Sequence, residues 1–84
     1  MSEINSVFDK EKLLEQFLKL ASWEMPFGKY AGRVLIDLPE AYLFWFEKSD
    51  WPNGELGELM RLALELKISG TDGLVKKLKS DQNS

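Results

Sequence analysis

The segment 25–46, MPFGKYAGRVLIDLPEAYLFWF, holds the features that decide the expected fold. Gly28 and Gly32 bracket a short turn, because glycine readily adopts the positive φ that a tight reversal needs. The residues after the turn, 34–36, include two β-branched side chains and suit a strand. We therefore predict a β-hairpin in the first half of this segment. Pro26 confines its first strand to an edge, since proline cannot donate to a ladder.

The second half of the segment predicts a helix. Residues 37–40, DLPE, are typical of a helix start. Asp37 would cap the helix, Glu40 would be its partner in a capping box, and Pro39 would occupy the first turn.

Four aromatic residues divide this helix into two sides. At about 100° per residue, Tyr42, Trp45 and Phe46 share one arc, which we assign to the core because large aromatic side chains dominate burial in small domains. Phe44 falls on the otherwise polar side. It is either covered by another part of the chain or exposed for a partner.

Amphipathic helices are expected on both sides of this segment. Upstream, apolar residues recur at helical spacing between residues 13 and 21, which predicts a helix starting at Ser6 or Asp9 and ending near Ser22. Downstream, a helix over about 55–68 is apolar around most of its circumference, so we expect it to be central and contacted from two sides. Gly57 in its first turn lowers helix stability by about 1 kcal/mol relative to alanine. A glycine at that cost indicates that another backbone, such as the hairpin, approaches closely.

A fourth, short helix is expected to begin at Thr71 or Asp72, with three apolar residues facing inward. The complete prediction is a single domain over residues 1–84, with 1–5 and 80–84 loosely held. Its class is α+β and mostly helical, with three to four helices and one β-hairpin inserted after the first helix. The inward-facing residues of the fourth helix are Leu74, Val75 and Leu78.

Composition excludes several kinds of chemistry. The 84 residues contain no cysteine and no histidine, which removes disulfides, thiolate ligands, the commonest metal ligand and the usual general base. We expect no cofactor, no metal and no enzymatic activity. The net charge of −3 repels phosphate backbones and anionic lipid. No apolar stretch approaches the roughly 18–20 residues that span a bilayer, so we expect no membrane contact and a cytoplasmic protein.

Five residues are candidates for binding. Lys29, Tyr30 and Arg33 place two cations and an aromatic ring on one glycine-bracketed turn, a combination that can contact phosphate and stack on a base. The alternative is that the glycines serve the turn, Tyr30 packs inward and the cations are solvated. Phe44 and Trp51, together with Leu62, fall at positions that periodicity assigns to solvent or loop. If exposed together they would mark an interaction surface, and a buried position is equally open.

Between residues 25 and 57 the chain resembles a family of small bacterial proteins described as putative quorum-sensing-regulated virulence factors. The family label carries no mechanism, so the resemblance implies a fold and a bacterial habitat rather than an activity. A similar FGK-x-x-G and LP-x-x-YL-x-W element looks like the small module that follows the catalytic domain in some exonucleases of the DEDD class. Ala31 stands where lysine is frequent in such motifs, which leaves this turn less basic. The matching residues are Met25-Pro26-Phe27-Gly28-Lys29-Tyr30, Gly32, Leu38-Pro39, Tyr42-Leu43, Trp45-Phe46 and Gly54-x-Leu56-Gly57.

Two functional hypotheses follow. The favoured one is a non-catalytic interaction module that binds a protein partner, or a second copy of itself, through the hairpin turn and the adjacent aromatic residues. The other is a nucleic-acid-binding accessory module that uses Lys29, Tyr30 and Arg33. The exonuclease resemblance does not extend to catalysis, because the chain lacks the arrangement of carboxylates that two-metal nuclease chemistry needs.

Overall fold

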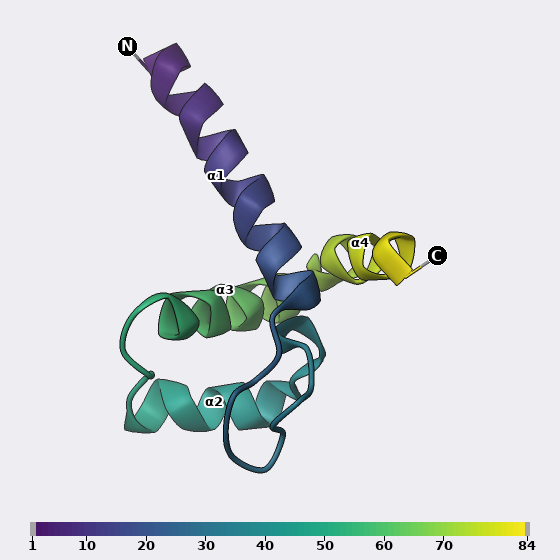
Figure 1. The fold of residues 1–84 in the computed structure, drawn as a ribbon. Helices are drawn as coiled ribbons and strands as arrows, with labels where there is room; N and C mark the ends of the chain where they lie inside the picture. The colour runs from purple at the N-terminus through teal and green to yellow at the C-terminus, as the bar shows by residue number, and fades with distance from the viewer. Residues whose placement is uncertain (1, 84) are drawn as a thin grey trace.

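The computed structural model describes the backbone of residues 2–83 and the side chains of residues 10–80. Met1 and Ser84 lie outside the described residues, and the expectation that 1–5 and 80–84 are loosely held stays a prediction. Five helical elements follow one another along the described chain (Figure 1). They are α1 (Ser2–Ser22), the 3-10 helix η1 (Leu35–Asp37), α2 (Glu40–Ser49), α3 (Glu55–Ser69) and α4 (Asp72–Asn83).

The predicted β-hairpin is wrong, and with it the α+β class, because residues 2–83 contain helices and loops but no strand. The chain does reverse after α1, yet antiparallel pairing is limited to one isolated bridge between Glu24 and Val34. Pro26, two residues beyond the bridge, has no N–H to extend a ladder. Leu35 and Ile36 are consecutive and both fully buried, whereas a strand would turn them to opposite faces. The single turn of η1 places both in the core instead.

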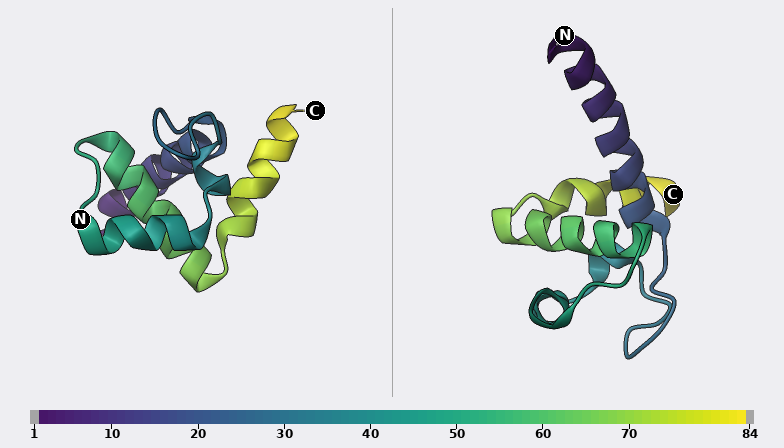
Figure 2. Two further views of the ribbon diagram at one scale, coloured as in Figure 1. Left: turned by 90° about the horizontal axis from the view of Figure 1, so that it is seen from below. Right: turned by 90° about the vertical axis from the view of Figure 1, so that its left-hand side faces the viewer.

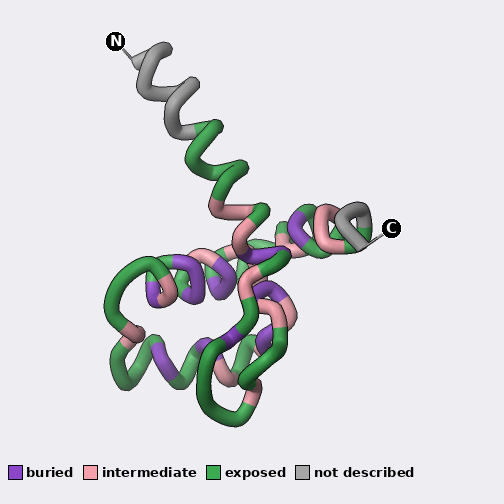
Figure 3. The backbone as a smooth tube through the Cα atoms, viewed as in Figure 1, coloured by how far each residue is buried: buried purple, intermediate pink, exposed green. Residues whose placement is uncertain are grey.

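α3 is the central helix, as the sequence predicted. It contacts α1, η1, α2 and α4, and Figure 3 shows the buried stretches of the other elements gathered around it. η1 also contacts α1 and α4, so the short segment that replaces the second hairpin strand is a core element. The largest fully buried side chains are Leu20, Met25, Leu35, Ile36, Leu38, Leu43, Leu59, Met60, Leu64 and Val75.

α1 projects from the body of the molecule (Figures 1 and 2). It begins at Ser2, earlier than the predicted start at Ser6 or Asp9, whose side chains lie outside those described. Burial begins only near its C-terminal end, at Leu20 and Ala21 (Figure 3). Three apolar residues that precede them in α1, Leu13, Leu14 and Leu18, are exposed.

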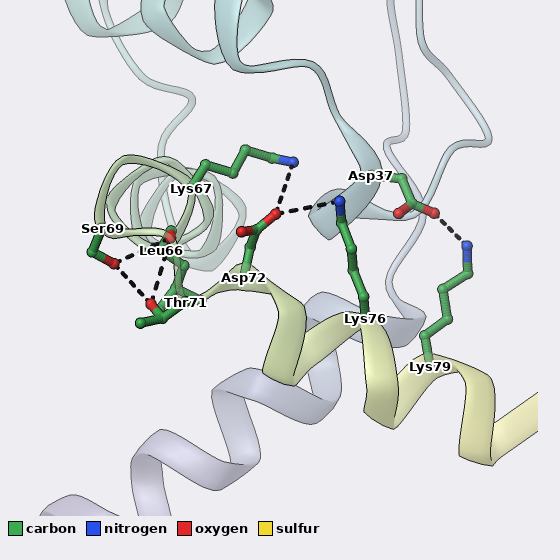
Figure 4. Close-up of polar contacts among 8 residues, drawn as sticks. All are labelled: Asp37, Leu66, Lys67, Ser69, Thr71, Asp72, Lys76 and Lys79. Carbon is green, nitrogen blue, oxygen red and sulfur yellow. Dashed lines mark hydrogen bonds and ion pairs between the residues drawn. The ribbon is translucent and has the colours of Figure 1, made fainter.

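The start of α2 differs from the predicted capping box. α2 begins at Glu40 after Pro39, and no side chain caps it. Asp37 lies in η1, and its carboxylate pairs with Lys79 of α4 instead (Figure 4). The carboxylate therefore ties η1 to the last helix of the described chain.

The turn from α3 to α4 is closed by polar contacts (Figure 4). Gly70 ends α3 in the left-handed region with φ 78°, a conformation that glycine adopts readily at the end of a helix. Asp72 at the start of α4 lies 3.8 Å from Lys67 Nζ and 3.3 Å from Lys76 Nζ. Burial lowers the pKa of Lys67, and the nearby Lys76 ammonium lowers it further. In α4 Val75 is fully buried, but Leu74, predicted to face inward, is 61% exposed.

Candidate functional site

The loop between α1 and η1 forms a compact reversal held by its own backbone. Met25, whose side chain is buried, donates from its N–H to Arg33 O at 2.8 Å and accepts from Gly32 N at 2.8 Å. Within the turn, Ala31 N donates to Gly28 O and Arg33 N to Tyr30 O, at 3.1 and 3.0 Å. These bonds and the buried Met25 side chain hold the backbone of residues 25–33 in one conformation. The exposed side chains of this segment therefore project from a fixed backbone. We call residues 25–33 the basic loop.

The glycines of the basic loop have the conformational role predicted for them. Gly28 and Gly32 have φ values of 81° and 90°, which side chains with a Cβ rarely adopt. A Cβ at Gly28 would also lie 3.1 Å from the hydroxyl of Tyr42. The turn therefore packs closely on α2.

Lys29 and Arg33 flank one aromatic ring. The guanidinium carbon of Arg33 lies 5.0 Å from the centre of the Tyr30 ring, and Lys29 Nζ lies 5.5 Å from it. Both distances are within the range of cation–π attraction. Neither cation belongs to an ion pair among the described residues. The structure thus brings the three predicted residues of the turn together as one basic and aromatic group.

A row of edge-to-face aromatic contacts connects this group to the core. Tyr30 meets Tyr42 at 4.7 Å between ring centres, and Tyr42 meets Phe46 at 5.1 Å. Phe46 stacks on Trp51 at 6.0 Å, and the guanidinium carbon of Arg61 lies 5.8 Å from the Trp51 ring. Burial raises the pKa of Tyr42, with a further contribution from Tyr30. The row fixes Tyr30 against α2 and so positions the two cations.

Phe44 belongs to α2 and Trp51 to the loop that follows it, and the two side chains differ in exposure. Phe44 is 41% exposed on α2. Trp51 is half-buried against Phe46, and its indole Nε1 is buried with no hydrogen-bond acceptor among the described residues. Leu62 is half-buried against the core. Of these three side chains, Phe44 is the most exposed.

The sequence analysis assigned Trp45 to the core, and that assignment is wrong. Trp45 is 60% exposed, whereas the buried residues of α2 are Leu43 and Phe46. Because α3 packs on the arc centred between positions 43 and 46, the side chain at 45 is turned away. Phe27, at 45% exposed on the basic loop, was also missed as a candidate. Its place in a turn beside Pro26, where no regular element covers a side chain, is the signal that could have found it.

Other kinds of site are not found in the part of the chain that the structure describes. No group of three or more carboxylates is arranged there to hold a metal ion. No pocket opens on the surface of these residues. No described helix combines the length and the apolar character needed to cross a membrane.

The fold and the surface together define a small helical domain of four α-helices that carries an exposed basic and aromatic loop after its first helix. More particularly, the chain belongs to the family described as "putative quorum-sensing-regulated virulence factor", which matches residues 13–78. The family resemblance inferred from the sequence is thereby confirmed. The uncharacterized protein YpeB of Escherichia coli K12 is 54% identical over 66 residues, which cover 77% of this chain and 92% of YpeB. YpeB of E. coli O157:H7 matches to the same extent. No solved structure matches significantly.

Proposed function

We propose that this chain is a non-catalytic protein-interaction module whose binding surface is the basic loop. The observation that carries the proposal is the placement of Lys29 and Arg33 on the ring of Tyr30, with no carboxylate partner among the side chains of residues 10–80. Other cations of the described residues, such as Lys12, Lys48 and Lys77, also lack an ion pair, but Lys29 and Arg33 are the two that share one aromatic ring. Two unpaired cations fixed at one place are complementary to an acidic segment of another protein.

The exposed Phe27 extends this surface with an apolar contact. Aromatic and arginine side chains are the residue types that most often dominate binding energy at protein interfaces. The basic loop is preorganised by its backbone hydrogen bonds, so little conformational entropy is lost when a partner binds. An acidic partner segment with an apolar residue fits this surface best.

A nucleic-acid-binding accessory module is the second candidate. It is favoured by the same cation and aromatic combination, which single-strand-binding proteins use to hold phosphates and stack bases. The net charge of −3 weighs against it, because a polyanion is repelled by the molecule as a whole. We therefore place it second.

One variant pair tests both candidates. Lys29→Glu/Arg33→Glu reverses the charge of the basic loop, and Lys12→Glu/Lys77→Glu makes the same change in net charge at two exposed lysines elsewhere. Each immobilised protein is exposed to an extract of the bacterium that produces the wild-type chain, and the bound proteins are compared. We expect a partner that is retained by the wild type and the control and lost by the loop variant. Circular dichroism checks that all three proteins are folded.

The same proteins are then titrated against labelled single-stranded DNA, RNA and duplex DNA by fluorescence anisotropy, at low and near-physiological salt. Binding that falls with salt and disappears only in the loop variant would establish the nucleic-acid function instead. If the loop reversal changes neither the captured proteins nor nucleic-acid binding, the basic loop is not a binding surface and both candidates fail.

A further inference from the structure

α2 carries an apolar surface that the basic loop does not use. Ala41, Phe44, Trp45 and Lys48 are all exposed, and they recur at the i, i+3, i+4, i+7 spacing that places residues on one face of a helix. Leu43 and Phe46 are the buried residues of the opposite side. α2 is therefore apolar on two faces, and the chain covers only one of them.

The arrangement of the elements leaves this outer face open. Among the helices, α2 contacts α3 alone within the described chain. α2 lies at the edge of the molecule, with α3 on one side and no other helix beyond it (Figures 1 and 2). We call Ala41, Phe44, Trp45 and Lys48 the outer face of α2.

Trp45, one of the two aromatic residues at the centre of this face, packs against a neighbouring ring. The ring of Trp45 meets Phe46 edge-to-face at 5.0 Å between centres, and Phe46 is buried. Trp45 is thus 60% exposed and yet packed against the core. An exposed tryptophan in a fixed orientation is a favourable anchor for an interface, because little side-chain entropy is lost on binding.

Opposite charges stand at the two ends of this face, and they favour a partner helix that runs in the opposite direction. Glu40 precedes Phe44 by four residues and Lys48 follows it by four, a separation of about 6 Å along the helix on each side. Neither belongs to an ion pair among the described residues. An antiparallel copy of the same helix, crossing at Phe44, would place its Lys48 beside this Glu40 and its Glu40 beside this Lys48.

We propose that the outer face of α2 binds a second copy of this chain, with the two α2 helices antiparallel about a two-fold axis near Phe44. Phe44 and Trp45 of the two copies pack in the centre, and two equivalent Glu40–Lys48 pairs close the ends. A two-fold interface of this kind uses the same patch on both copies, as most homodimers do. The surface differs from the basic loop, so this inference stands or falls independently of the proposed function.

The dimer is expected to be weak. A helix of ten residues is about 15 Å long, and its face is smaller than the roughly 800 Å² per partner of a standard stable interface. Sedimentation equilibrium between about 20 μM and 1 mM suits a dissociation constant on the order of 0.1–1 mM. We expect the average mass to rise with concentration from 9.7 kDa toward twice that value. A mass that stays at 9.7 kDa over the whole range would refute the dimer.

Point variants then locate the interface. Phe44→Asp should keep the protein monomeric, and because Phe44 is exposed the variant should fold normally. Leu14→Asp and Leu74→Asp introduce the same charge at exposed apolar positions of α1 and α4, and the Lys29→Glu/Arg33→Glu variant alters the basic loop. These three should dimerise like the wild type. If Leu14→Asp abolishes the dimer and Phe44→Asp does not, the exposed leucines of α1 form the interface and the proposal is wrong.

A charge exchange tests the antiparallel geometry. Glu40→Lys or Lys48→Glu alone should weaken the dimer several-fold, because each brings like charges together at both ends. The double variant restores opposite charges and should recover most of the affinity. If Glu40 and Lys48 mattered only within the monomer, the double variant should instead form the weakest dimer, because it loses both contributions to the fold. Within the monomer both side chains lie at the favourable ends of the α2 dipole, and Glu40 also raises the pKa of Lys67. A double variant that dimerises more weakly than either single variant would overturn the antiparallel arrangement.

Discussion

At residue 57 the absence of a side chain lets two backbone segments touch. A Cβ built on Gly57 would lie 1.9 Å from the carbonyl oxygen of Pro52, a distance no pair of heavy atoms tolerates without movement. The sequence indicated such an approach because glycine is costly inside a helix. It named the wrong partner, since the approaching backbone is the loop before α3 rather than the loop after α1.

We predict that Gly57→Ala destabilises the protein although alanine favours a helix. The clash should cost about 1–3 kcal/mol or more, against a gain in helix propensity of about 1 kcal/mol. Gly73→Ala is the matched control, because α4 leaves open space around that position. It should be neutral or stabilising by up to about 1 kcal/mol. Urea unfolding followed by circular dichroism measures both, and a Gly57→Ala protein as stable as Gly73→Ala would contradict the close contact.

Trp45 is a residue whose burial helical periodicity predicts wrongly. A helical wheel places Tyr42, Trp45 and Phe46 on one arc, and all three are apolar enough for a core. The neighbouring helix α3 instead covers a side of α2 that includes Leu43 and Phe46 and leaves Trp45 outside. The sequence records that a side chain can be buried, but the position of α3 decides which side chains are.

Among the elements, the segment between α1 and α2 departs most from expectation. Its glycines do form the predicted reversal, with positive φ at Gly28 and Gly32. Its second arm becomes η1 because both Leu35 and Ile36 enter the core. Local propensity favoured a strand, and contacts with three other helices favoured a 3-10 turn.

The start of α2 offers a test of what Asp37 does. If Asp37 capped α2 as predicted, Asp37→Ala would lower the free energy of unfolding by about 1 kcal/mol. Lys79→Ala would then leave it unchanged. In the structure Asp37 pairs with Lys79 of α4. Since both side chains are about a third exposed, the pair should contribute at most about 1 kcal/mol.

We therefore expect Asp37→Ala and Lys79→Ala each to lower the free energy of unfolding by about 0.2–1 kcal/mol, with the double variant no worse than either alone. Chemical denaturation of the four proteins completes the double-mutant cycle. Added salt should reduce the coupling. Strictly additive effects would show that the ion pair contributes nothing and that the carboxylate serves another purpose.

For the whole molecule, the arrangement around α3 explains why a chain of 84 residues folds without disulfides. α1, η1, α2 and α4 each place side chains against this one helix, so every element shares one core. Residues 10–15 of α1 are exposed and lie outside that core. The outer face of α2 likewise lies outside it.

The last helix tests whether the core extends across all the elements. Val75→Ala should destabilise the protein by about 1–2 kcal/mol, since it removes two buried methyl groups from a fully buried side chain. Leu74→Ala, at the adjacent exposed position, should change stability by less than about 0.5 kcal/mol. Thermal or urea unfolding distinguishes them. Equal losses at the two positions would show that α4 packs as the sequence predicted, with Leu74 inward.

The sequence by itself determined the helix predicted over about 55–68, which is α3 (Glu55–Ser69), and a helix starting at Thr71 or Asp72, which is α4 (Asp72–Asn83). It also determined the turn at Gly28 and Gly32, the close backbone contact at Gly57 and the family. These follow from spacing, backbone freedom and motif residues, which are local properties. Only the tertiary structure decided that residues 35–37 form η1, that Asp37 pairs with Lys79, and that Trp45 is exposed while Trp51 is half-buried. Each of these depends on which element packs on which face. The packing of the whole core sets that arrangement, and residues adjacent in the sequence do not determine it.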